Sequence, residues 1–126
     1  MEEDHSHNTR VIFVGQSHTV IEWLCLRSDV DLVAVFVPRI HYERSAWVSL
    51  CIYYQVPLYW ADTSQDIEQH LSRFKIQIDL GICAYFTKLS SQVFTHPHLG
   101  FINIHPGILP EYAGRLPSFA AVYAHV

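Results

Sequence analysis

The sequence lacks any hydrophobic run close to the roughly 20 residues that a membrane-spanning helix needs, and it lacks a run of basic residues. Its 126 residues carry 8 Lys and Arg against 12 Asp and Glu, a formal net charge of −4. A dedicated nucleic-acid domain usually carries a stripe of Lys and Arg, so we expect neither a nucleic acid nor a membrane as partner. The first residues, MEEDHSHNTR, are acidic and polar and do not form a secretion signal, which predicts a cytoplasmic protein.

Cysteine is scarce as well, because Cys25, Cys51 and Cys83 are far apart and no CxxC pair occurs. This odd number, without the spacing of a ligand pair, argues against a disulfide framework and against a zinc site. We therefore interpret the three as buried, reduced thiols and expect no metal. His5 and His7 could bind a metal ion, but we interpret residues 1–9 as a flexible, solvated N-terminus.

The sequence does contain two alternating patterns, and half of its residues are hydrophobic. Short, almost continuously apolar runs occupy residues 11–15, 32–37, 57–61, 79–86 and 101–105. Segments with helical spacing lie between them, at 18–28, 43–55, 64–74 and 90–95. Continuous apolar runs are typical of strands buried on both faces. The order predicts an α/β fold: a Rossmann-like, open, mostly parallel sheet with helices on both faces, in one domain over residues 10–126.

The helical segments show apolar stripes and capping residues. The stripe of the first helix comprises Val20, Ile21, Leu24 and one of Trp23 or Leu26. Hydroxyl side chains are placed to cap three of the helices: Ser17, then Thr63 or Ser64, then Ser90. The last residues, 117–126, have the pattern of a helix that begins there.

In open α/β sheets, ligands bind outside the carboxyl ends of the strands, and the last predicted strand ends on two polar residues. Asn103 and His105 are two positions apart, so their side chains point to the same face, while Ile104 points to the other. Pro106 cannot donate a ladder hydrogen bond and marks the end of the strand. From spacing alone, the pair is either functional or simply two polar residues at the end of a strand.

The segment NIHPGILPEYAGRLP, residues 103–117, resembles the signature of the folate-dependent formyltransferases, roughly N-x-H-P-[SG]-x-L-P-x-[YW]-x-G-x-x-P. Glycinamide ribonucleotide, methionyl-tRNA and sugar N-formyltransferases share that signature. The matching positions are Asn103, His105, Pro106, Gly107, Leu109, Pro110, Tyr112, Gly114 and Pro117. The upstream alternation of strands and helices is similar to the N-terminal domain of this family. The Pro-Gly and Glu-Tyr pairs at 106–107 and 111–112 look closest to the sugar-amine and hydrogenase-maturation branches.

The resemblance implies transfer of a formyl group from 10-formyltetrahydrofolate to a primary amine. Asn103 would donate its amide N–H to the oxygen that becomes negative as the amine attacks. His105 would donate to it as well, or carry the proton from the amine to the leaving nitrogen.

Two further loops take their expected roles from the resemblance. AYFTKLS, residues 84–90, looks like the loop that meets the pterin ring, which would place Phe86, Thr87, Lys88 and Leu89 around the donor. A plain strand-to-helix connection capped by Ser90 is the alternative, and both can hold together. VGQSHT, residues 14–19, looks like the turn that faces the amine, so Gln16 and Ser17 are substrate-binding candidates, together with Pro106 and Gly107. The alternative is that Gln16 and Ser17 only turn the chain and cap the helix. GxGxxG is absent, and we predict no dinucleotide binding.

The sequence departs from the family in one respect. The family has a catalytic Asp a few dozen positions beyond the Asn-x-His, and this chain ends at Val126 without one. We therefore expect either a formyltransferase completed by a C-terminal segment or a second copy, as in a homodimer, or an impaired folate- or amine-binding module. An unrelated flavodoxin-like domain is the third interpretation. The acidic chain makes a small amine, such as an amino sugar, a better substrate candidate than tRNA.

Overall fold

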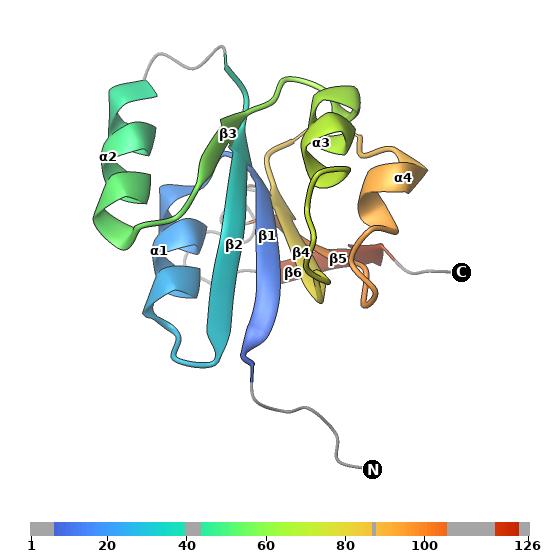
Figure 1. Ribbon diagram of the computed structural model, residues 1–126, viewed down its shortest axis with the longest axis horizontal. Coiled ribbons are helices and arrows are strands. Elements are labelled where there is room, and N and C mark those ends of the chain that lie inside the picture. Colours follow the sequence, from blue (N-terminus) through green and yellow to red (C-terminus); the bar gives the residue numbers. More distant parts are fainter. Residues whose placement is uncertain (1–6, 40–43, 87, 106–117, 124–126) are drawn as a thin grey trace.

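The computed structural model describes residues 7–39, 44–86, 88–105 and 118–123, with side chains described as far as residue 104. One six-stranded sheet runs through the molecule in the order β3-β2-β1-β4-β5-β6 (Figure 1). Its strands are β1 (Thr9–Gly15), β2 (Val30–Val37), β3 (Leu58–Trp60), β4 (Leu80–Ala84), β5 (Phe101–His105) and β6 (Ser118–Tyr123). The first five pair in parallel and β6 pairs antiparallel with β5. The predicted Rossmann-like, mostly parallel sheet is confirmed.

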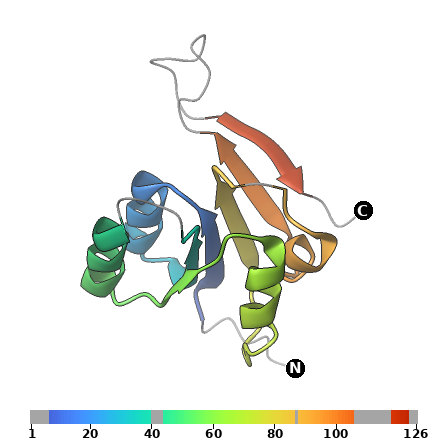
Figure 2. The same cartoon turned by 90° about the horizontal axis from the view of Figure 1, so that it is seen from above.

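Helices cover both faces of the sheet (Figure 2). On one face lie α1 (His18–Leu26) and α2 (Arg44–Tyr54), and on the other lie α3 (Ser64–Leu71) and α4 (Ser91–Phe94). Alternate residues of β1 enter opposite cores: Phe13 packs with α1 and α2, whereas Ile12 and Val14 pack with α3 and α4. All three side chains are fully buried, which explains why the strand reads as one apolar run.

Three predicted caps are found at the helix starts. The Ser17 hydroxyl oxygen accepts from the Val20 N–H at 3.2 Å, and that of Ser90 accepts from the Val93 N–H at 3.3 Å. Of the two candidates for α3, Thr63 is the cap, and it forms a reciprocal capping box with Asp66. Each hydroxyl pairs an N–H group that the helix itself leaves without an acceptor.

The apolar stripe of α1 is narrower than predicted. Val20, Ile21 and Leu24 are buried, but Trp23 and Leu26 are 51% and 74% exposed. The prediction that one of them joins the stripe was wrong, because both positions lie outside the side of α1 that packs on the sheet. Trp23 instead packs beneath a guanidinium, with Arg27 Cζ 5.0 Å from its ring centre.

After residue 117 the structure has a strand where the sequence pattern predicted a helix. Residues 118–123 form strand β6, not the first turns of a helix, and β6 pairs with β5 in the register Ile102↔Val122 and His105↔Ser118. The outer edge of β5 presents backbone N–H and C=O groups that a further strand can pair, and a helix would leave them unpaired.

Strand β1 begins at Thr9, so the last position of the predicted flexible terminus lies within the sheet. His7 Nε2 lies 3.4 Å from Oδ2 of Asp79, the residue before β4, while residues 1–6 lie outside the described residues. Among the described helices, none has the length and apolar character to pass through a bilayer.

Candidate functional site

The strand order reverses direction at β1, whose neighbours are β2 on one side and β4 on the other. In open α/β sheets this switch point opens a crevice outside the carboxyl ends of the two central strands. The chain leaves β1 at Gly15 (φ +135°) and leaves β4 through Tyr85 (φ +58°). The Gln16 N–H donates to the Ala84 carbonyl at 2.9 Å, so a hydrogen bond connects the residue after β1 to the last residue of β4.

Gln16 and Ser17, the predicted amine-binding pair, follow β1 at this edge. The Gln16 side-chain amide donates to the Tyr85 carbonyl at 3.4 Å, and the residue is half-buried. The Ser17 hydroxyl oxygen is occupied by the first turn of α1. Gln16 therefore lies in the turn after β1, and Ser17 caps α1. Contact of either residue with a substrate stays a prediction.

Asn103 lies on β5, beside the carboxyl end of β4, with Cys83 as its parallel neighbour. Ile104 is buried against α1 and α2, whereas Phe101 is buried against α3 and α4. Because strand side chains alternate, Asn103 shares the face of Phe101 and of α3 and α4. Its side chain is half-buried.

His105 is the last residue of β5, two positions beyond Asn103, so it closes the strand at the edge where ligands bind. Its side chain lies outside the described residues, as do Pro106 and Gly107. The side-by-side arrangement of the amide and the imidazole stays a prediction.

The loop predicted to meet the pterin ring leaves β4 at the same edge. Phe86 is half-buried against the core on the α3 and α4 side, and Leu89 is 3% exposed within that core. Lys88 is exposed, and Thr87 lies outside the described residues. The loop is thus anchored by two apolar side chains, and its role toward a donor stays a prediction.

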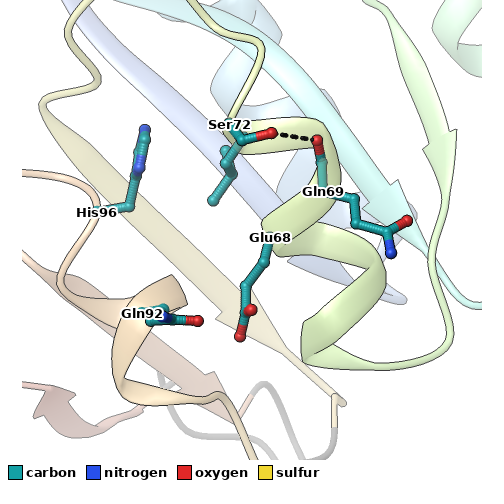
Figure 3. Close-up of a pocket in the computed structure, with 6 residues that line it drawn as sticks. Glu68, Gln69, Ser72, Gln92 and His96 are labelled. Atoms are coloured by element: carbon teal, nitrogen blue, oxygen red, sulfur yellow. Dashed lines mark hydrogen bonds between the residues drawn. The ribbon is translucent and has the colours of Figure 1, made fainter.

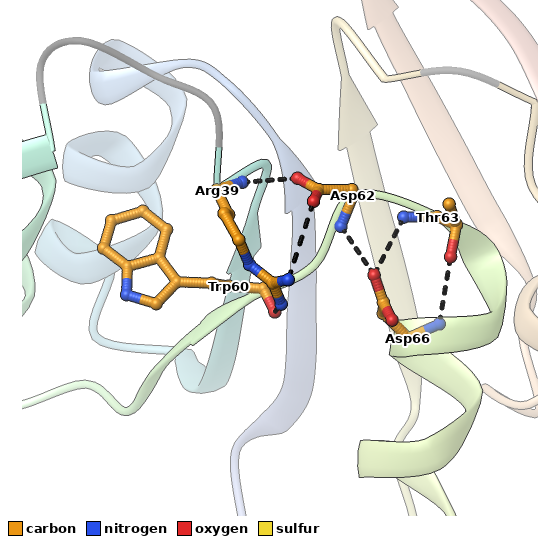
Figure 4. Close-up of polar contacts among 5 residues, drawn as sticks. All are labelled: Arg39, Trp60, Asp62, Thr63 and Asp66. Atoms are coloured by element: carbon orange, nitrogen blue, oxygen red, sulfur yellow. Dashed lines mark hydrogen bonds and ion pairs between the residues drawn. The ribbon is translucent and has the colours of Figure 1, made fainter.

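A chain of polar contacts runs along the carboxyl edge from β2 to α3 (Figure 4). The Arg39 N–H donates to Asp62 Oδ1 at 2.6 Å, and the Arg39 guanidinium lies 3.8 Å from Asp62 Oδ2. The N–H groups of Asp62 and Thr63 both donate to Asp66 Oδ2, at 3.0 and 3.3 Å. The hydrogen bond from Asp62 lowers the pKa of Asp66 most, burial opposes it, and the bond from Thr63 lowers the pKa further. Sequence reasoning missed this network, because no local pattern brings Arg39 to Asp62.

The cysteines contribute no nucleophile to this edge. Cys51 and Cys83 are buried and free, and burial raises the pKa of their thiols to about 11 and about 12. At neutral pH both thiols stay protonated and unreactive. Cys25 is half-buried, and burial together with the charge of Glu22 raises the pKa of its thiol too. Within the described part of the chain, no three His, Cys, Asp or Glu side chains are grouped as metal ligands would be.

Three surface hollows formed by described residues lie away from the carboxyl edge, and none of the three is lined by a predicted site residue. One lies between α3 and α4 and is lined by Glu68, Gln69, Leu71, Ser72, Gln92 and His96 (Figure 3). Another separates α1 from α2, beside His18 and Tyr54, and a third follows the end of α2 near Pro57. The carboxyl edge is therefore the candidate site on strand topology.

Comparison with known proteins relates the chain to one family. A family model described as "Formyl transferase" matches residues 51–125, more than half of the chain. The methionyl-tRNA formyltransferases of Staphylococcus aureus strains Newman and JH1 are each 28% identical to it over 123 residues. The matches cover 90% of this chain but 40% of each relative, so the chain spans about two-fifths of the length of these curated relatives. From residue 51, the match takes in β3, β4 and β5 and the residues that follow each of them, and the chain belongs to the formyl transferase family.

Proposed function

We propose that the protein transfers a formyl group from 10-formyltetrahydrofolate to a primary amine, in the cytoplasm. The observation that carries the proposal is the position of Asn103 on β5, beside the carboxyl end of β4 and two residues before His105 at the strand end. The family match covers this segment and the loop after β4, which would carry the oxyanion donor and the contacts to the folate.

The chemistry follows from the charge that develops during transfer. When the amine attacks the formyl carbon, the formyl oxygen becomes negative, and the amide N–H of Asn103 would donate to it. One preorganised donor of this kind lowers the barrier by about 3 kcal/mol. His105 would donate to the same oxygen or carry the proton from the amine to the leaving nitrogen, because an imidazole exchanges protons near neutral pH.

The residues after β4 suit a folate donor. Tyr85 and Phe86 place two aromatic side chains at the exit of the strand, 44% exposed and half-buried respectively. Flat apolar side chains beside backbone hydrogen-bonding groups are what a pterin ring packs against. The donor supplies the formyl group, and this loop would orient it toward Asn103.

Two classes of amine are candidates. The acidic composition, with net charge −4 and no basic run, favours a small amine such as an amino sugar. The names of the relatives favour the amine of methionyl-tRNA instead. A carboxylate that orients His105 would come from a C-terminal segment or from a second copy of the chain, and turnover is proposed for the full-length protein.

The test is formyl transfer by the full-length protein, with each amine class supplied in turn and product followed by mass spectrometry. We expect Asn103→Ala to lower kcat about 100-fold or more, as the loss of an oxyanion donor does. His105→Ala is expected to abolish transfer while its circular dichroism spectrum and Tm match the wild type. Turnover retained by His105→Ala would refute the role given to that residue. Failure of 5-formyltetrahydrofolate to raise the Tm of the wild type would argue against a folate donor altogether.

A further inference from the structure

One hydroxyl group of helix α3 makes two hydrogen bonds with the loop after β4. Ser64, the first residue of α3, accepts the Ser90 N–H on its Oγ at 2.8 Å and donates to the Lys88 carbonyl at 3.4 Å. The two backbone groups flank Leu89, whose side chain is buried in the core beneath. One side chain of α3 therefore holds the backbone on both sides of that anchor.

One helical turn further along, Glu68 makes a second connection from the same side of α3. Its Oε2 accepts the Ser90 hydroxyl at 2.7 Å. With the amide nitrogen of Gln92 turned to the carboxylate, that nitrogen also donates to Glu68 Oε1 at 2.6 Å. Figure 3 shows the ends of the Glu68 and Gln92 side chains facing each other between α3 and α4. Hydrogen bonds to a charged carboxylate are stronger than neutral ones, so this connection is firm.

Helix α3, which carries Ser64 and Glu68, is itself held in place. The first turn of α3 is held by Thr63 and Asp66, and through Asp62 to the end of β2. Ile67 and Leu71 on the inner side of α3 are buried against the sheet. The helix is therefore a rigid support, and the loop from Lys88 to Ser90 takes its position from it.

We propose that Ser64 and Glu68 are positioning residues for the formyl donor. The inference rests on the proposed function, in which Phe86, Lys88 and Leu89 line the side of the pterin ring. Ordering a mobile loop when the ligand binds costs free energy and weakens the affinity. A loop that is already held in place binds its ligand without that cost. Neither Ser64 nor Glu68 touches the reacting atoms, and both act through Lys88 and Ser90.

The test compares Ser64→Ala with Ser64→Thr, which keeps the hydroxyl, and with Gln65→Ala at the exposed neighbouring position, all in the full-length protein. Loss of a hydrogen bond of this kind is expected to raise the donor KM and the Kd for 5-formyltetrahydrofolate about three- to tenfold in Ser64→Ala. The amine KM and kcat should stay within about twofold of wild type, because the reacting groups are unaltered. Amide hydrogen exchange at Ser90 should accelerate in the same variant, and Ser64→Thr should restore the wild-type values.

Substitutions of Glu68 provide a second, independent test of the proposal. Glu68→Gln keeps an acceptor for the Ser90 hydroxyl and should bind the donor more tightly than Glu68→Ala. If the wild type binds 5-formyltetrahydrofolate but Ser64→Ala accelerates exchange at Ser90 without altering the donor KM, the positioning role is wrong and the proposed function stands. If donor KM, amine KM and Tm all shift together, the contact serves only the fold. If the wild type neither binds the folate nor transfers formyl, the proposed function fails and takes this inference with it.

Discussion

Gly15 approaches Ala84 so closely that a Cβ atom on Gly15 would lie 1.8 Å from the Ala84 carbonyl oxygen. The two residues end β1 and β4, the central pair of the sheet, and are register partners. The same carbonyl accepts the N–H of Gln16 at 2.9 Å. Because Gly15 has no side chain, the ends of β1 and β4 can pack directly against each other. They do so at the point where the topology predicts a ligand crevice.

Gly15→Ala is expected to lower the free energy of unfolding by about 3 kcal/mol or more, because a methyl group would separate β1 from β4 and would occupy a left-handed dihedral of φ +135°. Urea unfolding of the two proteins measures this difference. Gly100→Ala provides the comparison, since Gly100 is a second glycine with a positive φ, +86°. A cost for Gly15→Ala no larger than that for Gly100→Ala would contradict the close approach.

Asp79 is expected to make the protein sensitive to acid. Burial raises its pKa, but hydrogen bonds from the Arg10 N–H and from His98 and His7 outweigh burial and bring the pKa below its ordinary value of 3.8. The contribution of a carboxylate with a depressed pKa is fully present above pH 4 and is lost as the pH falls through the lower, folded-state pKa. The free energy of unfolding should therefore fall more steeply below pH 4 in the wild type than in Asp79→Asn.

Urea titrations between pH 3 and pH 6 on both proteins test the role of Asp79. The substitution to Asn keeps an oxygen that accepts the Arg10 N–H, while it removes the charge and the oxygen that faces His98 Nε2. Identical pH profiles for the two proteins would show that Asp79 titrates equally in the folded and unfolded states.

Much of the fold was predictable because its signals are local. Continuous apolar runs marked the five parallel strands, and Ser17 and Ser90 were correctly placed as caps from their positions before apolar stripes. The strand at 118–123 could not be predicted in this way, because a short run rich in Ala, Val and Phe suits either a helix or a strand until the strand it pairs with is known. That edge, on β5, is a tertiary feature.

The candidate site divides in the same way. The period of two along β5 predicts that Asn103 and His105 share one face, and this stays a prediction because the His105 side chain lies outside the described residues. Ile104, between them, is buried, as the alternation predicts. The contacts of Ser64 with Lys88 and Ser90 span 24 and 26 residues, and no pattern within either segment points to the other. A serine at the start of a helix predicts a cap, and here the neighbouring Thr63 takes that part and leaves Ser64 for a distant loop.

Thr63→Ala should destabilise the protein by about 1 kcal/mol, because it removes the hydroxyl that pairs the Asp66 N–H at the start of α3. The loss is expected as a lower midpoint in urea with an unchanged slope. Thr63→Ser keeps the hydroxyl and should retain most of the stability. Equal destabilisation by Ala and Ser would show that the methyl group matters and the cap does not.

His18→Phe is expected to raise stability by about 1 kcal/mol, because it removes a polar atom that is buried without compensation. Within the described part of the chain, His18 Nε2 is buried and has no hydrogen-bond partner, while the imidazole packs edge-on against Trp47 with ring centres 4.0 Å apart. A phenyl ring preserves that packing and has no nitrogen to leave unpaired. His98→Phe is the matched control and should lower stability, since His98 Nε2 lies 2.8 Å from Asp79 Oδ1. Thermal unfolding of both variants decides the matter, and a lower Tm for His18→Phe would mean that its imidazole nitrogen is paired in solution.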